Sequence, residues 1–228
     1  MSDEAETVGV AEVAGAPVQT GHVFVIAAPS GTGKTTICQR ILAQDPRLRL
    51  SISHTTRPPR AGEKNGVHYQ FVSAKAFREL REAKRFLEHA EYGGFVYGTS
   101  WMAIEEPLEL GQDVVLEIEV QGAAQVRERR PSACLIFLLP PSLAVLEARL
   151  RGRDTDSEDV IQRRMTLVDR ELAAAKIFDF AIVNDDLETA VDQVLEVIEA
   201  VRAGRGEAIA STHGRAAVLA RWNESQVS

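Results

Sequence analysis

The stretch Ala28-Pro-Ser-Gly-Thr-Gly-Lys-Thr35 decides the fold. It follows an apolar run over 23–27 and leads into an amphipathic pattern over 34–44, which is the order of a strand, a phosphate-binding loop and a helix. In such a loop successive backbone N–H groups point into one concavity, and the helix dipole adds positive potential. We therefore predict a nucleotide phosphate site in which Lys34 supplies a full charge and the Thr35 hydroxyl is a Mg²⁺ ligand.

The first position of this loop departs from the general pattern, which begins with glycine, because Ala28 stands there. Gly31, Gly33, Lys34 and Thr35 match the rest. A glycine-rich β-to-α turn that binds nothing is the alternative interpretation. The lysine-threonine pair directly after the second glycine favours phosphate binding.

Composition limits the class of protein. The chain has 228 residues, 45% of them hydrophobic and 26% charged, which suits one α/β domain with an inserted lobe. A net charge of -7 argues against a nucleic-acid surface. Cys38 and Cys134 lie far apart and show neither metal-ligand nor redox spacing, so we expect buried thiols in a reducing cytosol.

The N-terminal residues do not have the pattern of a signal peptide. Residues 1–20 contain acidic residues but no lysine or arginine, so they lack the basic start of a signal peptide, and we expect a disordered acidic tail. No apolar run reaches the ~18 residues of a membrane span. We therefore expect a soluble, cytoplasmic protein without a membrane partner.

Apolar and amphipathic segments alternate along the chain. Apolar runs at 23–27, 113–120, 134–139 and 180–183 alternate with helical patterns near 34–44, 121–130, 142–151, 158–177 and 186–203. This order predicts βαβ units, and hence an α/β fold whose parallel sheet has helices on both faces. The core would comprise 21–52, 100–150 and 171–203.

Two segments interrupt this alternation. Residues 53–99 combine a short alternating pattern at 67–72, a charged helix near 74–85 and an aromatic, glycine-rich turn, so we predict a small mixed nucleotide-binding lobe. The polar piece 151–156 predicts a mobile lid, with a lid region over 151–170. The C-terminal tail, 204–228, is polar with one helical patch over 216–222.

Three sets of residues could serve the phosphate loop. Arg57 and Arg60 flank two prolines, which suits guanidinium groups held for bidentate phosphate binding, although a solvated loop is the alternative. Glu88 lies in the lobe with Tyr69, Tyr97 and Thr99. It is either an exposed carboxylate or part of a pocket that reads a base and binds a phosphate.

The third set is a pair of carboxylates. Glu117 and Glu119 alternate along an apolar strand and project to one side, where an acidic residue orients Mg²⁺ or its waters, unless they are simply charges at a strand end. Arginines from the lid and its flanking helices could neutralise a phosphoryl group in transfer, or lie on the surface: Arg149, Arg153 and Arg164.

With these residues in view, the chain resembles the bacterial guanylate kinases over about 22–202. The motifs that carry the resemblance are Ala-Pro-Ser-Gly-Thr-Gly-Lys-Thr at 28–35, Ser-His-Thr-Thr-Arg-Pro-Pro-Arg at 53–60, Phe-Leu-Glu-His-Ala at 86–90, Tyr-Gly-Thr at 97–99, Glu-Ile-Glu-Val-Gln-Gly at 117–122, Leu-Arg-Gly-Arg at 150–153 and Ile-Val-Asn-Asp-Asp at 182–186. The family accepts alanine at the start of the loop. Many of its members have aspartates where Glu117 and Glu119 stand.

The resemblance implies an enzyme that phosphorylates GMP with ATP by in-line transfer, with Mg²⁺ as cofactor. The implied GMP site comprises Ser53, Glu88 and Thr99 at the guanine and Arg57, Arg60, Tyr69 and Tyr97 at the phosphate, with Glu117 reaching base or metal. The implied ATP site comprises Ala28, Pro29, Ser30, Gly31, Thr32, Gly33, Lys34, Thr35, Thr36 and Asn184. Lys34, Arg149, Arg153 and Arg164 would be catalytic, and Glu119 would meet Mg²⁺ through water.

Two other classes compete with this interpretation. A P-loop GTPase would need an Asn-Lys-x-Asp motif, and the nearest match, at 184–186, lacks the lysine. A guanylate-kinase-like interaction module would bind peptides without catalysis and is expected to lose loop or lid residues. Lys34, Thr35, Arg153 and Arg164 are all present, which favours the enzyme.

Overall fold

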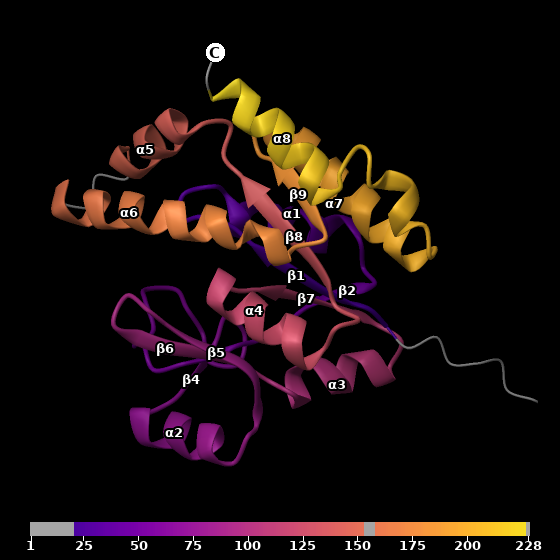
Figure 1. Ribbon diagram of the computed structural model, residues 1–228. Helices are drawn as coiled ribbons and strands as arrows, with labels where there is room; N and C mark the ends of the chain where they lie inside the picture. Colours follow the sequence, from indigo (N-terminus) through magenta and orange to yellow (C-terminus); the bar gives the residue numbers. More distant parts are fainter. Residues whose placement is uncertain (1–20, 153–157, 227–228) are drawn as a thin grey trace, which may run out of the picture.

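A five-stranded parallel sheet forms the centre of the protein, a computed structural model of which describes residues 21–152 and 158–226 (Figure 1). Its strands run in the order β2-β7-β1-β8-β9, with parallel pairing throughout. They are β1 (Val23–Ala27), β2 (Leu48–Leu50), β7 (Asp113–Glu117), β8 (Cys134–Leu139) and β9 (Phe180–Val183). The predicted α/β fold with a parallel sheet is confirmed. The sequence analysis missed β2, because three residues are too few to show a period.

Helices cover both faces of this sheet. α1 (Lys34–Gln44) and α7 (Leu187–Arg202) pack on one face, and α3 (Met102–Glu109), α4 (Val120–Arg129) and α8 (Arg215–Ser225) pack on the other. Successive side chains of a strand point to opposite faces. Accordingly, Phe24 shares a buried cluster with Ile41 of α1, whereas Val25 shares one with Val126 of α4.

A second pair of helices lies beside the phosphate loop. α5 (Leu143–Arg151) and α6 (Glu158–Ala174) pack through their own apolar cluster, and the 3-10 turn η1 (Ala175–Ile177) follows α6. The tip of the predicted lid, including Arg153, falls outside the described residues.

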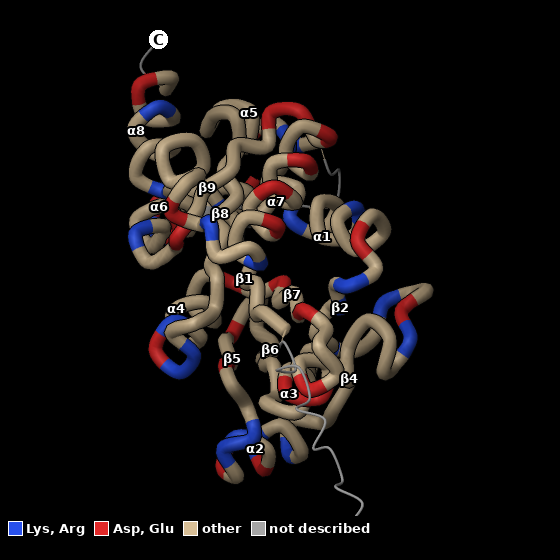
Figure 2. Tube along the Cα trace, turned by 90° about the vertical axis from the view of Figure 1, so that its right-hand side faces the viewer, with Lys and Arg blue, Asp and Glu red and all other residues tan. Residues whose placement is uncertain are grey.

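The inserted segment forms a separate mixed sheet in the order β4-β3-β6-β5. Its elements are β3 (His54–Thr55), β4 (Gln70–Phe71), α2 (Ala74–Glu82), β5 (Phe86–Tyr92) and β6 (Phe95–Ser100). Gly93 and Gly94 have φ of 60° and 80°, as a two-residue hairpin turn requires. Figures 1 and 2, which differ by a quarter turn, both show α2 on the side of this lobe away from the parallel sheet.

The C-terminal segment is folded against the sheet. After α7 come the 3-10 turn η2 (Gly206–Ile209) and α8, whose Val218 and Trp222 are buried. The amide of Ala181 in β9 donates to the His213 carbonyl at 2.9 Å, so this segment also covers the edge of β9. No helix among the described residues has the length and apolarity to cross a membrane.

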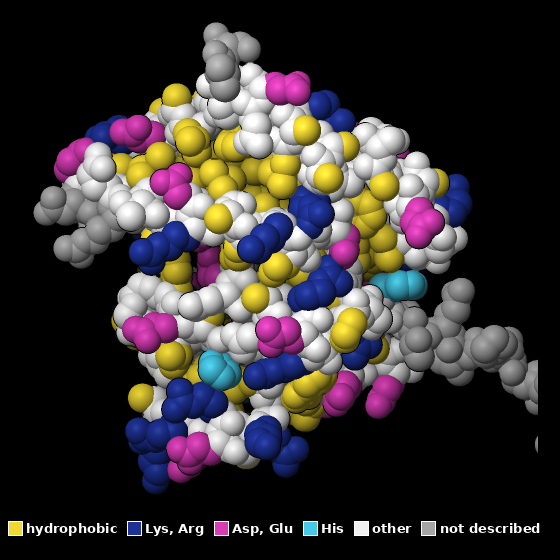
Figure 3. All heavy atoms as spheres, viewed as in Figure 1, with side chains coloured by type: hydrophobic (Ala, Val, Ile, Leu, Met, Phe, Trp, Pro, Cys, Tyr) yellow, Lys and Arg dark blue, Asp and Glu magenta, His cyan; other side chains and the backbone are white. Residues whose placement is uncertain are grey.

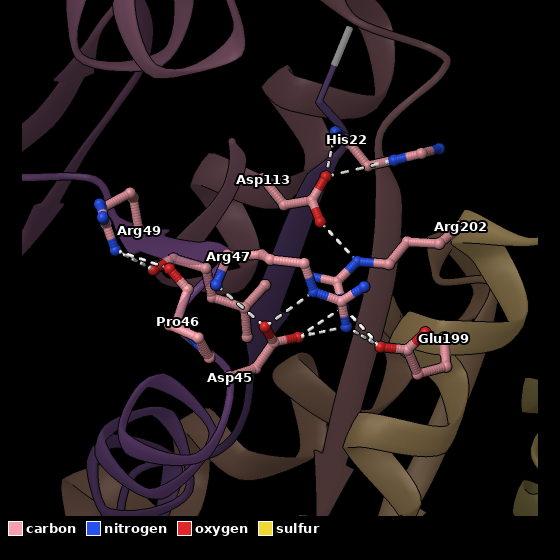
Figure 4. A network of polar contacts seen from close by, with 9 residues as sticks. His22, Asp45, Pro46, Arg47, Arg49, Asp113, Glu199 and Arg202 are labelled. Carbon is pink, nitrogen blue, oxygen red and sulfur yellow. Dashed lines mark hydrogen bonds and ion pairs between the residues drawn. The ribbon is translucent and has the colours of Figure 1, made fainter. Parts of the chain in front are cut away.

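A network of charged side chains fastens the end of α7 to the sheet (Figure 4). Arg202 donates from Nε to Asp113 Oδ2 at 2.5 Å and from Nη1 to Asp45, and its side chain is 11% exposed. Burial opposes ionisation of Asp45, but hydrogen bonds from Arg47 and Arg202 outweigh it and hold the pKa of this carboxyl well below its usual range. The network therefore joins α7, β7 and the loop before β2.

We predict that Arg202→Ala lowers the free energy of unfolding by about 2–4 kcal/mol, because it leaves buried carboxylates short of a partner. Denaturant titration near neutral pH measures this loss. The depressed pKa of Asp45 stabilises the folded protein at pH values above the pKa of this group in the unfolded chain. The difference in free energy of unfolding between the variant and the unmodified protein should therefore narrow below about pH 4. The exposed Arg49→Ala is the control, with an expected change within about 0.5 kcal/mol. Equal losses in the two variants would contradict the prediction.

Candidate active site

A cavity of about 350 Å³ lies between the phosphate loop and the inserted lobe, where the space-filling view is hollowed (Figure 3). It brings together most of the predicted site residues: Ala28, Pro29, Ser30, Gly31, Gly33, Lys34, Thr35, Thr36, Ser53, Arg57, Arg60, Tyr69, Glu88, Tyr97, Glu117, Glu119 and Arg164. Residues that the sequence analysis did not single out also line it, namely Ala90, Tyr92 and Ile118. Thr32 and Thr99 are buried and are not among the lining residues.

The phosphate loop is held in shape from behind. Gly31 and Gly33 have φ of 94° and 96°, a backbone region that favours glycine. The Asn184 side-chain amide donates to the Thr32 carbonyl at 2.6 Å, and a Cβ on Gly33 would lie 2.5 Å from the same nitrogen. Arg149 in turn reaches the Asn184 carbonyl at 3.4 Å. Asn184 and Arg149 thus support the loop from outside the cavity.

Lys34 connects the loop to the end of β7. Its Nζ donates to the Ile118 carbonyl at 2.8 Å and to Glu119 Oε1 at 3.0 Å. Burial acts to lower the pKa of this ammonium, but the carboxylates of Glu119 and Glu117 outweigh it, and the net shift of the pKa is upward. The neighbouring Thr35 hydroxyl donates to Glu117. The Lys34 ammonium and the Thr35 hydroxyl are thus held in place where the loop meets α1.

Arg57 is oriented before any ligand arrives. Its guanidinium makes two hydrogen bonds to Glu63, at 2.8 and 3.0 Å, and lies over the Tyr69 ring at 5.5 Å. Hydrogen bonding from Arg57 lowers the pKa of Glu63 to about 2. The Arg60 amide also donates to Glu63, at 2.6 Å. The sequence analysis missed Glu63, although an acidic residue close to an arginine pair was the available signal.

Glu88 is a buried carboxylate, with 2% of its surface exposed. Its Oε1 accepts from the Thr99 amide at 2.8 Å and from the Thr99 hydroxyl at 2.6 Å, and that hydroxyl lies 3.1 Å from Ser53 Oγ. Burial raises the pKa of Glu88 to about 6. A Cβ on Gly122 would lie 2.3 Å from Glu88 Oε2, so only glycine fits beside this carboxylate. The sequence analysis quoted Gly122 in a motif and assigned it no role.

α6 contributes an arginine and a carboxylate at a spacing of two helical turns. Arg164 Nη1 donates to Ser30 Oγ in the loop at 3.1 Å. Burial raises the pKa of Glu171 to about 7, and the nearby charge of Glu119 acts in the same direction. Residues seven apart share one helix face, and this spacing could have identified Glu171 from the sequence.

Comparison with known proteins agrees with this geometry. The family model for guanylate kinase matches residues 20–201. This chain belongs to the guanylate kinase family. A guanylate kinase of Neisseria gonorrhoeae is 53% identical over 185 residues, which cover 81% of this chain and 90% of that protein. A guanylate kinase of Aromatoleum aromaticum is 48% identical over 182 residues, which cover 80% and 89%.

A solved structure supports the same assignment. The crystal structure of guanylate kinase from Anaplasma phagocytophilum superposes with a TM-score of 0.67 at 28% identity, covering 85% of this chain and 96% of that one. The predicted enzyme class is confirmed: the activity is ATP-dependent phosphorylation of GMP, and the substrates are ATP and GMP. This result excludes the GTPase and the interaction module that competed with it.

The raised pKa of Glu88 predicts a pH-dependent effect on stability. In the folded protein this carboxyl binds a proton more tightly than in the unfolded chain, so its contribution is present below about pH 4.5 and is lost as the pH rises through 6. Glutamine cannot ionise, so Glu88→Gln removes this loss. We therefore predict that the change in the free energy of unfolding caused by Glu88→Gln is more favourable at about pH 8 than at about pH 4.5, by up to ~2 kcal/mol. Denaturant titration without nucleotides measures it. Glu91→Gln, which changes an exposed carboxyl of the same strand, is the control, and an equal pH dependence in both variants would refute the prediction.

Proposed function

We propose that this guanylate kinase transfers the γ-phosphoryl group of ATP in line to a phosphate oxygen of GMP, with Mg²⁺ as cofactor, and that it acts in the cytoplasm. One observation carries the proposal: a single cavity joins the phosphate loop to the arginine and carboxylate groups of the inserted lobe. Two nucleotides whose phosphates meet in that cavity would have donor and acceptor side by side, and positioning of this kind supplies much of phosphoryl-transfer catalysis.

GMP would bind in the inserted lobe, over 53–99. Guanine presents N1–H and an amino group as adjacent donors, and the Glu88 carboxylate can accept both, with Ser53 and Thr99 beside it. Arg57 and Arg60 are suited to the phosphate, because both line the cavity and a guanidinium carries a permanent positive charge. Tyr69 and Tyr97 also line the cavity, and their hydroxyls would donate hydrogen bonds to the GMP phosphate.

ATP would bind across the loop, with the backbone of 28–36 around its phosphates and Asn184 near the adenine. Lys34 and Arg164 are placed to offset charge on the migrating group, which is where such charges contribute most. We also propose a catalytic role for Arg149, although its guanidinium contacts the Asn184 carbonyl outside the cavity. Arg153, for which we propose the same role, lies outside the described residues.

The residues at the loop fit Mg²⁺. This ion is usually held by one or two protein oxygens together with substrate phosphates and water. The Thr35 hydroxyl donates a hydrogen bond to the Glu117 carboxylate at the loop. The neighbouring Glu119 carboxylate accepts one from Lys34. We propose Thr35 as a direct ligand, with Glu119 reached through water, and we propose that Glu117 contacts GMP. When bound, the ion would neutralise phosphate charge.

The proposed transfer needs no basic catalyst, because the accepting phosphate oxygen is already anionic. The protein therefore has to hold two polyanions together and keep water out. Arg57, fixed by Glu63, orients the acceptor, and Lys34 and Arg164 stabilise charge on the donor. A coupled assay of ADP release with ATP and GMP tests the reaction, and dependence on added Mg²⁺ tests the cofactor.

Removal of the loop lysine should abolish most of the activity. We predict that Lys34→Ala lowers kcat by on the order of 10²-fold or more, since an oriented charge in a closed site contributes ~3–4 kcal/mol. Steady-state kinetics measure kcat, and circular dichroism checks the fold. Lys75→Ala, on the exposed face of α2, is the matched control and should leave turnover unchanged. Near-normal turnover of Lys34→Ala would remove the phosphate loop from the proposed mechanism.

Base selectivity should depend on Glu88. Adenine offers an acceptor at N1 and would leave the buried carboxylate without the two hydrogen bonds that guanine can donate. We predict that Glu88→Gln lowers kcat/KM for GMP by roughly 10- to 100-fold, because a charge-assisted hydrogen bond is worth ~1.5–3 kcal/mol, and that it narrows the gap to AMP. KM for ATP should barely change, and Glu91→Gln is again the control. Impaired ATP binding with intact GMP selectivity would place the acceptor site elsewhere.

A further inference from the structure

The last helix of the chain makes specific contacts with the connection between β8 and α5. Trp222 Nε1 donates to the Pro140 carbonyl at 2.6 Å. The Gln226 side chain accepts from the Leu143 amide at 3.1 Å and donates to the Pro141 carbonyl at 3.2 Å. These contacts lie beyond residue 201, where the match to the family model ends. Figure 1 shows α8 beside the connection that leads into α5.

These contacts satisfy backbone groups that α5 cannot satisfy itself. The first N–H groups of a helix have no partner within it. The Ser142 hydroxyl accepts a hydrogen bond from the Val145 amide. Gln226, at the end of α8, accepts one from the Leu143 amide. The buried Pro140 carbonyl accepts a hydrogen bond from Trp222, a residue that is itself 6% exposed. The position and direction of the start of α5 are therefore fixed by α8.

α5 in turn supports the phosphate loop. A Cβ on Gly31 would lie 3.0 Å from Leu150 and 3.1 Å from Leu146, so the helix packs directly on the loop backbone. From the same helix, Arg149 contacts the Asn184 carbonyl, and the Asn184 side chain donates to the Thr32 carbonyl in the loop. A shift of α5 would therefore reach the loop along two routes, through apolar contact and through hydrogen bonds.

α6 would move with α5. Leu146 and Leu150 share a buried cluster with Ile161 and Val168 of α6. From α6, Arg164 reaches Ser30 in the loop at 3.1 Å. The contacts made by α8 thus affect the phosphate loop and Arg164, whereas the inserted lobe packs on α3 and α4.

We propose that Trp222 and Gln226 are positioning residues for the ATP half of the site. They act by holding the start of α5, and through it the phosphate loop and Arg164. The inference rests on the proposed role of this loop in binding ATP. It assigns to the C-terminal segment a task in the reaction, in addition to covering the edge of β9.

The test combines kinetics with hydrogen exchange on the full chain. The variants are Gln226→Ala and the double variant Trp222→Phe with Gln226→Ala, in which phenylalanine keeps an aromatic ring in the core. We expect KM for ATP to rise about three- to tenfold in the double variant, the equivalent of one or two neutral hydrogen bonds, with KM for GMP unchanged. Amide exchange at 143–146 should become faster in both variants.

Arg221→Ala is the matched control. Arg221 lies on α8 but contacts the carbonyls of Ser211 and Thr212, away from α5, so this variant should change neither KM nor exchange at 143–146. Unchanged exchange in the double variant would overturn the proposal, and so would an equal rise of both KM values. If exchange rises while Lys34→Ala leaves ATP use intact, the proposed role of the loop fails instead, and the support of α5 by α8 stands.

Discussion

The parallel pairing of β1 between β7 and β8 is the constraint on which the rest of the structure depends. Parallel strands end at a common edge, so the loop after β1, the carboxylates after β7 and the segment after β9 meet there. The register places Ile26 opposite Glu117, which brings that carboxylate level with the phosphate loop. The Lys34 contacts with Ile118 and Glu119 then join the two strand ends across the cavity.

The two sides of the cavity solve different electrostatic problems. On the loop side, burial of the Lys34 ammonium is offset by nearby carboxylates, so the charge that a phosphate needs is kept. On the lobe side, burial raises the pKa of Glu88 in spite of two hydrogen bonds from Thr99, and a ligand with adjacent donors would compensate the ionised carboxylate further. The Glu63 carboxylate holds the Arg57 guanidinium in one orientation, so little further side-chain entropy is lost when Arg57 contacts a phosphate. Keeping buried charged groups ready for a ligand therefore lowers the free energy of unfolding of the protein without nucleotides.

Elements remote from the cavity hold its parts in register. The Arg202 network fixes the end of α7 to β7 and to the loop before β2, while Trp222 and Gln226 fix the start of α5. Both devices pair buried polar groups that would otherwise lack partners, which makes each geometry specific as well as stable. Their common feature is that they lie at the ends of helices, where unpaired backbone groups and charge gather.

The sequence by itself determined the phosphate loop, the central strands and the helices between them, because an apolar period and the Gly-x-Gly-Lys-Thr spacing are local properties of the chain. It also indicated the guanylate kinase family and nearly all residues that line the cavity. Only the tertiary structure decided that Glu63 holds Arg57, that Gly122 makes room for Glu88 and that Gln226 caps α5. Two of these pairs join distant segments, which no period or spacing in a single chain encodes. Glu63 and Arg57 are close in sequence, but their contact depends on where the side chains point, which closeness alone does not settle. The C-terminal segment shows the same limit: its polar composition predicted a tail, but Trp222 and Val218 become core residues once β9 offers an uncovered edge.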